Sequence, residues 1–130
     1  MNRWRCYNKG DDKQLSPSFH LREFECKGDG CCSSTIISET LLAILESFRA
    51  KVGKPIILNC SYRCPQHNSD VGGTEKSYHQ LGMAADIRVL DMTPDEVAEA
   101  AEPFFKGIGR YNTFTHVDVR ANRVRFDNRS

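Results

Sequence analysis

Three side chains that could hold a metal ion stand in the second half of the chain: His79, Asp86 and His116. Imidazole nitrogen and carboxylate oxygen bind zinc at about 2.0–2.2 Å, and three such ligands leave one position of a tetrahedral site open. Water in that position has its pKa lowered to about 7, and the ion polarises a bound carbonyl. Spacing alone is a weak signal, because histidine and aspartate at these intervals are also common as unrelated surface groups.

The motifs around these residues are more specific. Residues 77–86 read S-Y-H-Q-L-G-M-A-A-D and resemble the S-x-H-x-x-G-x-A-x-D signature of the M15 family of zinc peptidases, which includes D-alanyl-D-alanine carboxypeptidases. Residues 60–68, C-S-Y-R-C-P-Q-H-N, are similar to the family's S-G-Y-R-x-P-x-x-N segment, with Cys60 and Ser61 in place of its serine and glycine. Residues 114–118, F-T-H-V-D, resemble its closing F-x-H-x-D element. The resemblance covers residues 18–126.

The resemblance implies roles for five residues. It makes His79, Asp86 and His116 the ligands of one zinc ion, so Zn²⁺ is the expected cofactor. It makes Arg63 the cation that grips the substrate carbonyl or the developing oxyanion. Ser77 would hydrogen-bond the substrate or steady the neighbouring histidine.

The general base is not assigned by the resemblance. In several branches of the family an acidic residue stands three positions before the last zinc histidine, and Thr113 occupies that position here. Asp118 lies two residues after His116, on the same face of a strand. It could therefore take a proton from zinc-bound water or orient the histidine from behind. We favour the orienting role slightly.

Local signals indicate the elements that must position these groups. Ser38 and Gly53 are suitable caps for a helix over residues 39–52, and the capping box T-P-D-E at 93–96 starts a second helix. Residues 27–35 are typical of a loop. Strand-like runs cover 56–60, 85–90, 108–111, 114–119 and 123–126, and the last two are close enough for a hairpin.

Alternation along two of these runs places the candidate ligands on one face of each strand and apolar residues on the other. Asp86 alternates with apolar residues in one run, and His116 and Asp118 do so in the other. We therefore expect an α+β fold, with a small, mainly antiparallel sheet that carries helices on one face and the zinc site on the other. The resemblance implies that this is the fold of hedgehog domains and D-alanyl-D-alanine peptidases.

Length and charge limit the remaining possibilities. The 130 residues predict a single catalytic domain over 18–130, preceded by an N-terminal arm over 1–17. The net charge of +1 gives no argument for nucleic acid, and the basic run near the C-terminus is interpreted as a solvated strand face. No stretch approaches the roughly 20 apolar residues of a membrane span. A monomer is expected.

Six cysteines allow several interpretations. They stand at positions 6, 26, 31, 32, 60 and 64. Disulfides or buried thiols are favoured over a second metal site, because only the last two approach the close pairing of a zinc motif. Cys26 is expected to pair with Cys31 or Cys32, and a bridge between Cys60 and Cys64 could brace the loop that holds Arg63.

The leading hypothesis is a zinc-dependent metallopeptidase that hydrolyses the stem peptides of cell-wall peptidoglycan. The resemblance implies either a carboxypeptidase of the D-Ala-D-Ala type or an endopeptidase. Such an enzyme acts on the cell wall, and the lack of a visible signal peptide suits an endolysin released by phage-type lysis or a domain excised from a longer protein. One alternative is a zinc-containing binding domain of the same fold that has lost catalysis. Another is a cysteine-stabilised interaction domain with no metal.

Overall fold

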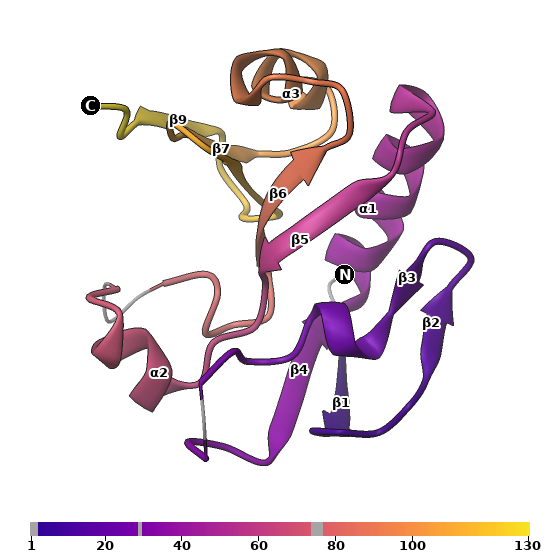
Figure 1. The fold of residues 1–130 in the computed structure, drawn as a ribbon, viewed down its shortest axis with the longest axis vertical. Coiled ribbons are helices and arrows are strands. Elements are labelled where there is room, and N and C mark those ends of the chain that lie inside the picture. The colour runs from indigo at the N-terminus through magenta and orange to yellow at the C-terminus, as the bar shows by residue number, and fades with distance from the viewer. Residues whose placement is uncertain (1–2, 29, 74–76) are drawn as a thin grey trace.

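The computed structural model describes residues 3–28, 30–73 and 77–130 (Figure 1). The expectations for the first two residues of the arm and for position 29 of the loop lie outside this part. The elements are, in chain order, β1 (Trp4–Asn8), β2 (Gln14–Ser16), β3 (Phe19–His20), η1 (Leu21–Glu23), β4 (Ser34–Ser38), α1 (Glu39–Val52), β5 (Ile56–Cys60), α2 (Pro65–Asp70), β6 (Ala84–Val89), α3 (Pro94–Ala101), β7 (Gly107–Arg110), β8 (Thr115–Asp118) and β9 (Val124–Asp127). This confirms the α+β class.

The central sheet has five strands in the order β5-β6-β8-β7-β9. All neighbouring strands pair antiparallel except β7 and β9, which are parallel. The predicted hairpin between the last two strands is therefore wrong. Because β6 and β7 occupy both edges of β8, β9 pairs with the outer edge of β7, where Arg125 binds the Glu102 carboxylate and the carbonyl of Lys106 after α3.

The two predicted helices begin where their caps indicate. The Ser38 hydroxyl accepts a hydrogen bond from the Leu41 amide at the start of α1, and Gly53 ends that helix with φ of 65°. Thr93 forms the expected capping box with Glu96 at the start of α3. Within the described residues, no helix is both long and apolar enough to cross a membrane.

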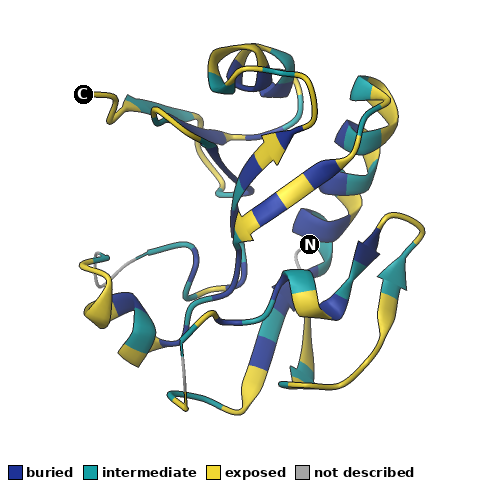
Figure 2. Ribbon diagram, in the orientation of Figure 1, coloured by how far each residue is buried: buried dark blue, intermediate teal, exposed yellow. Residues whose placement is uncertain are grey.

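The main core lies between the sheet and the helices α1 and α3. Leu45 and Phe48 of α1 and Val97 of α3 are buried together with the sheet residues Ile87 and Val117. Figure 2 shows the buried segments along these inner faces. Because strand residues alternate between faces, Asp86 and His116 are directed to the opposite side.

The N-terminal segment is attached to this domain by strand pairing. β1 pairs antiparallel with β4, which the sequence analysis had assigned in part to a loop. The Trp4 indole also donates a hydrogen bond of 2.7 Å to the Leu81 carbonyl. These contacts connect residues 3–8 to the turn that precedes β6.

Candidate metal site and substrate pocket

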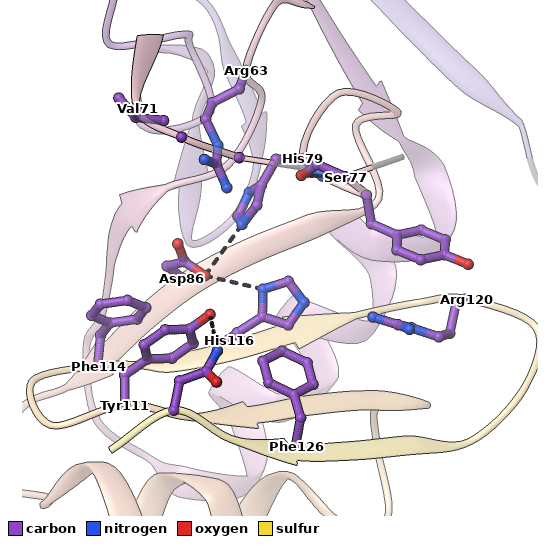
Figure 3. Close-up of a pocket in the computed structure, with 14 residues that line it drawn as sticks. Arg63, Val71, Ser77, His79, Asp86, Tyr111, Phe114, His116, Arg120 and Phe126 are labelled. Atoms are coloured by element: carbon purple, nitrogen blue, oxygen red, sulfur yellow. Dashed lines mark hydrogen bonds and ion pairs between the residues drawn. The ribbon is translucent and has the colours of Figure 1, made fainter. Parts of the chain in front are cut away.

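The structure brings His79, Asp86 and His116 together (Figure 3). Asp86 of β6 and His116 of β8 are directly opposite each other in the antiparallel pairing. His79 reaches them from the turn before β6. Oδ1 of Asp86 lies 3.3 Å from Nε2 of His79 and 3.1 Å from Nδ1 of His116. One carboxylate oxygen therefore stands between two imidazole nitrogens.

Each histidine has an acceptor on its other nitrogen. Nδ1 of His79 lies 2.7 Å from the Ser61 carbonyl, and Nε2 of His116 lies 2.7 Å from Oδ2 of Asp118. A carbonyl and a carboxylate oxygen can only accept, so each of these nitrogens carries the proton. The nitrogens that face Asp86 would donate their lone pairs to a metal ion that displaces the protons they share with this carboxylate, as in histidine-ligated metal sites.

Each of the two contacts at Asp86 fits one edge of a tetrahedral zinc site. Ligand atoms about 2.0–2.2 Å from a tetrahedral ion are separated by about 3.3–3.6 Å, close to the two distances measured at Asp86. The Cys60 thiol also lies near His79 and Asp86 and could be considered a ligand. Its sulfur approaches Nδ1 of His79 at 3.8 Å, and that nitrogen is already engaged by the Ser61 carbonyl. His116 lines the pocket together with His79 and Asp86 and Cys60 does not, so we take His116 as the third ligand.

The electrostatics follow from these short contacts. Burial works to raise the pKa of the Asp86 carboxyl, but hydrogen bonds from His116 and His79 hold it well below its ordinary value. Burial works to lower the pKa of each imidazole, but the partner carboxylates of Asp86 and Asp118 raise it above the usual value. The carboxylate is thus ionised over the physiological range, and protons compete with a cation for the two nitrogens.

Asp118 is placed behind His116. Its side chain is fully buried, and the guanidinium of Arg120 donates two hydrogen bonds of 2.8 and 2.6 Å to its two carboxylate oxygens. Asp118 does not line the pocket, so the geometry favours the orienting role over that of a general base. The Arg120 guanidinium stacks 4.3 Å from the centre of the Tyr78 ring. Arg120 therefore belongs to this site, although its basic segment had been interpreted as a solvated face.

Arg63 lines the same pocket. Its backbone amide donates a hydrogen bond of 3.1 Å to the His79 carbonyl, which fixes the loop against the metal site. Figure 3 shows its guanidinium directed toward the metal-site residues. Its buried Nε has no hydrogen-bond partner in the described part of the chain. Because this atom is enclosed, a substrate oxygen would be bound by the terminal nitrogens of the guanidinium.

Ser77 and Gly82 shape the turn that presents His79. The Ser77 hydroxyl accepts a hydrogen bond of 3.2 Å from the His79 amide, and Ser77 also lines the pocket. Gly82 has φ of 69°, and a Cβ at this position would overlap the Ile36 carbonyl. Only glycine meets both conditions without strain.

The pocket in front of the metal site has a volume of about 660 Å³. Aromatic side chains that the sequence analysis did not identify form one wall: Tyr111 stacks on Phe114 at 4.4 Å, and Phe126 contacts both Tyr111 and His116. Among the described residues that line it, Asp86 is the sole carboxylate. Thr113 borders a separate, smaller cavity.

Two glycines of β7 make room for the site. A Cβ on Gly107 would overlap the Asp118 carboxylate, and one on Gly109 would overlap the Phe126 ring. We expect Gly107→Ala to destabilise the protein by about 1–3 kcal/mol, because Asp118 must shift in a packed interior. Denaturant unfolding measures this. In an Asp118→Ala background the same substitution is expected to cost clearly less, and equal costs in both backgrounds would contradict the assigned contact.

A family model described as Peptidase M15 matches residues 13–118. The matched region includes every metal-site residue described above. No curated protein sequence matches the chain.

Proposed function

The chain belongs to the peptidase M15 family, and on that premise we propose that it is a zinc-dependent hydrolase of peptidoglycan stem peptides. Members of this family are metal-dependent peptidases. The single observation that carries the proposal is the pocket in which the Arg63 guanidinium faces the cluster of His79, Asp86 and His116.

The chain's own residues prepare this pocket for peptide hydrolysis. His79, Asp86 and His116 would hold a zinc ion, which supplies an activated water and polarises the scissile carbonyl. The Ser61 carbonyl and the Asp118 carboxylate fix the two imidazole rings so that Nε2 of His79 and Nδ1 of His116 face Asp86. This preorganisation means that the ligands do not have to reorient when the substrate enters.

Arg63 would stabilise the charge that develops during the reaction. A peptide carbonyl that is attacked by water becomes a tetrahedral oxyanion, and a fixed guanidinium binds that anion more strongly than the neutral carbonyl. The aromatic wall of Tyr111, Phe114 and Phe126 would pack against the apolar parts of the bound peptide. Both features suit a short peptide held across the pocket.

A non-catalytic binding domain remains the second candidate. The specific observation in its favour is that Asp86, a proposed ligand, is the sole carboxylate among the described pocket residues, so a general base is not evident there. The Arg63 guanidinium that lines the pocket favours catalysis, because a purely structural metal site has no use for it. Turnover separates the two candidates.

The experiment uses three synthetic substrates and mass spectrometry of the products. They are a stem pentapeptide that ends in D-Ala-D-Ala, a cross-linked dimer of such stems, and the same pentapeptide made wholly of L-residues. We expect the zinc-loaded protein to cut at least one of the first two and to leave the L-control intact. Loss of one D-Ala identifies a carboxypeptidase, and an internal cut identifies an endopeptidase. Equal cleavage of the L-control would contradict the proposed substrate class.

A further inference from the structure

Four cysteines meet on the side of the Arg63 loop away from the pocket: Cys26, Cys31, Cys32 and Cys64. Their sulfur atoms all lie within 4.8 Å of one another. Figure 1 shows the loop that follows η1 running beside the start of α2, where Cys64 is the N-cap. We propose that these four thiolates bind a second metal ion, a structural zinc, that is separate from the pocket.

The sulfur separations fit a single tetrahedral ion. Zinc binds thiolate sulfur at about 2.3 Å, which places neighbouring sulfurs about 3.8 Å apart. The sulfurs are 3.7 Å apart between Cys26 and Cys31, 3.9 Å between Cys26 and Cys64, 4.0 Å between Cys31 and Cys32, and 3.2 Å between Cys31 and Cys64. With four thiolate ligands the site has no open position, which is typical of structural rather than catalytic zinc.

Other side chains of the protein enclose the cysteine cluster. Cys26 and Cys64 are buried with Tyr62, and Cys31, Cys32 and Ile36 pack against them. The backbone amide of His67 donates to the Cys64 sulfur at 3.4 Å, a contact that stabilises a thiolate.

Close packing around the cluster depends on a glycine. A Cβ on Gly28 would overlap the Cys31 sulfur and the His67 ring. The Lys9 ammonium donates a hydrogen bond of 2.8 Å to the Gly28 carbonyl, which brings a positive charge to the same loop. A site of four thiolates and one zinc carries net negative charge, so a nearby cation is favourable.

This arrangement changes the expectation for the cysteines. All six thiols, which lie within the described residues, are free. The expected bridge from Cys26 to Cys31 or Cys32 is not formed, and neither is the bridge between Cys60 and Cys64. A disulfide would join two sulfurs at about 2.05 Å, which is shorter than every sulfur separation given above. One zinc ion would bind all four thiolates. Cys6 is exposed on β1, and Cys60 lies at His79, so neither belongs to this cluster.

The second ion would join two distant parts of the chain. Cys26 and Cys64 are 38 residues apart, and the Tyr62 amide donates to the Phe24 carbonyl at 3.0 Å beside them. The loop between Ser61 and Cys64 contains Arg63, so the ion would hold that loop from behind. The site itself does not depend on the proposed peptidase function.

Metal analysis of the full chain, purified under reducing conditions with zinc and without chelator, tests the proposal. We expect two zinc ions per parent chain, one in Cys64→Ser and two in the matched control Cys6→Ser. His116→Ala, which removes a ligand from the pocket, is expected to keep one. Its X-ray absorption spectrum should show only sulfur neighbours at about 2.3 Å.

Two outcomes would overturn the proposal. The first is a His116→Ala protein that is folded and binds no zinc, or binds it through nitrogen and oxygen alone. The second is mass mapping of the zinc-exposed parent under non-reducing conditions that finds a disulfide within the cluster. The His116→Ala spectrum retains all four thiols, so the test stands even if Cys64→Ser does not fold. Loss of turnover with both ions bound would contradict the proposed function and leave this site intact.

Discussion

His116→Ala is expected to lose the zinc ion of the pocket and to abolish detectable cleavage of stem peptides. His116 supplies one of the three side-chain donors assigned to this ion, and its replacement leaves Asp86 and His79 to hold the ion. The zinc content of each sample is determined by elemental mass spectrometry. The rate of turnover of the cleaved peptide is measured in the same sample. Total zinc should fall by one ion per chain.

Two further variants serve as comparisons for the His116→Ala result. Asp118→Asn weakens the acceptor behind His116 and is expected to reduce metal affinity or activity by about 10–100-fold, as for other groups that orient a metal ligand. His20→Ala serves as the matched control, because His20 is bonded to Asp12 and lies outside the pocket. Full zinc occupancy in His116→Ala, at parental turnover, would remove His116 from the ligand set.

Arg63→Ala is expected to lower kcat by about 10²–10³-fold while zinc content and Tm remain at the parental level. The guanidinium meets full charge only when the tetrahedral oxyanion forms, so its loss affects kcat more than KM. Arg63→Lys should recover little, because an ammonium lacks the planar fork that binds two oxygens at once. Steady-state kinetics on the cleaved stem peptide give both constants.

The control for Arg63 is Arg88→Ala. Arg88 is exposed on β6, donates to Asn59 and lies outside the pocket, so its removal should leave kcat unchanged. If both Arg63 variants melt at a lower temperature yet turn over at the parental rate, Arg63 only stabilises its loop. In that case the mechanism has no group to bind the oxyanion.

Local signals in the sequence predicted the elements that depend on neighbouring residues. The caps at Ser38 and Thr93 defined the starts of α1 and α3, and period-two alternation placed Asp86 and His116 on one face of the sheet. Three motifs in order indicated the family. In each case the information lies within about ten residues of the element concerned.

Features that join distant segments were missed or wrong. The pairing of β9 with β7 depends on Arg125 reaching the end of α3, and the helix α2 is too short to show a period. Arg120 was interpreted as a surface charge, because the sequence does not show that the Asp118 carboxylate it binds is buried. The four-thiol cluster needs Cys64 to approach three cysteines from more than thirty residues earlier, which spacing alone does not reveal.

Zinc-dependent digestion of purified peptidoglycan tests the central claim most directly. The parent protein is stripped of metal, then assayed before and after zinc is restored, and the released fragments are identified by mass spectrometry. We predict that one type of peptide bond in the stem or cross-link is cut only after zinc is restored, and that His116→Ala treated identically releases nothing. A folded, zinc-restored parent that leaves the peptidoglycan intact, or a stripped parent that cuts it at the same rate, would contradict the account.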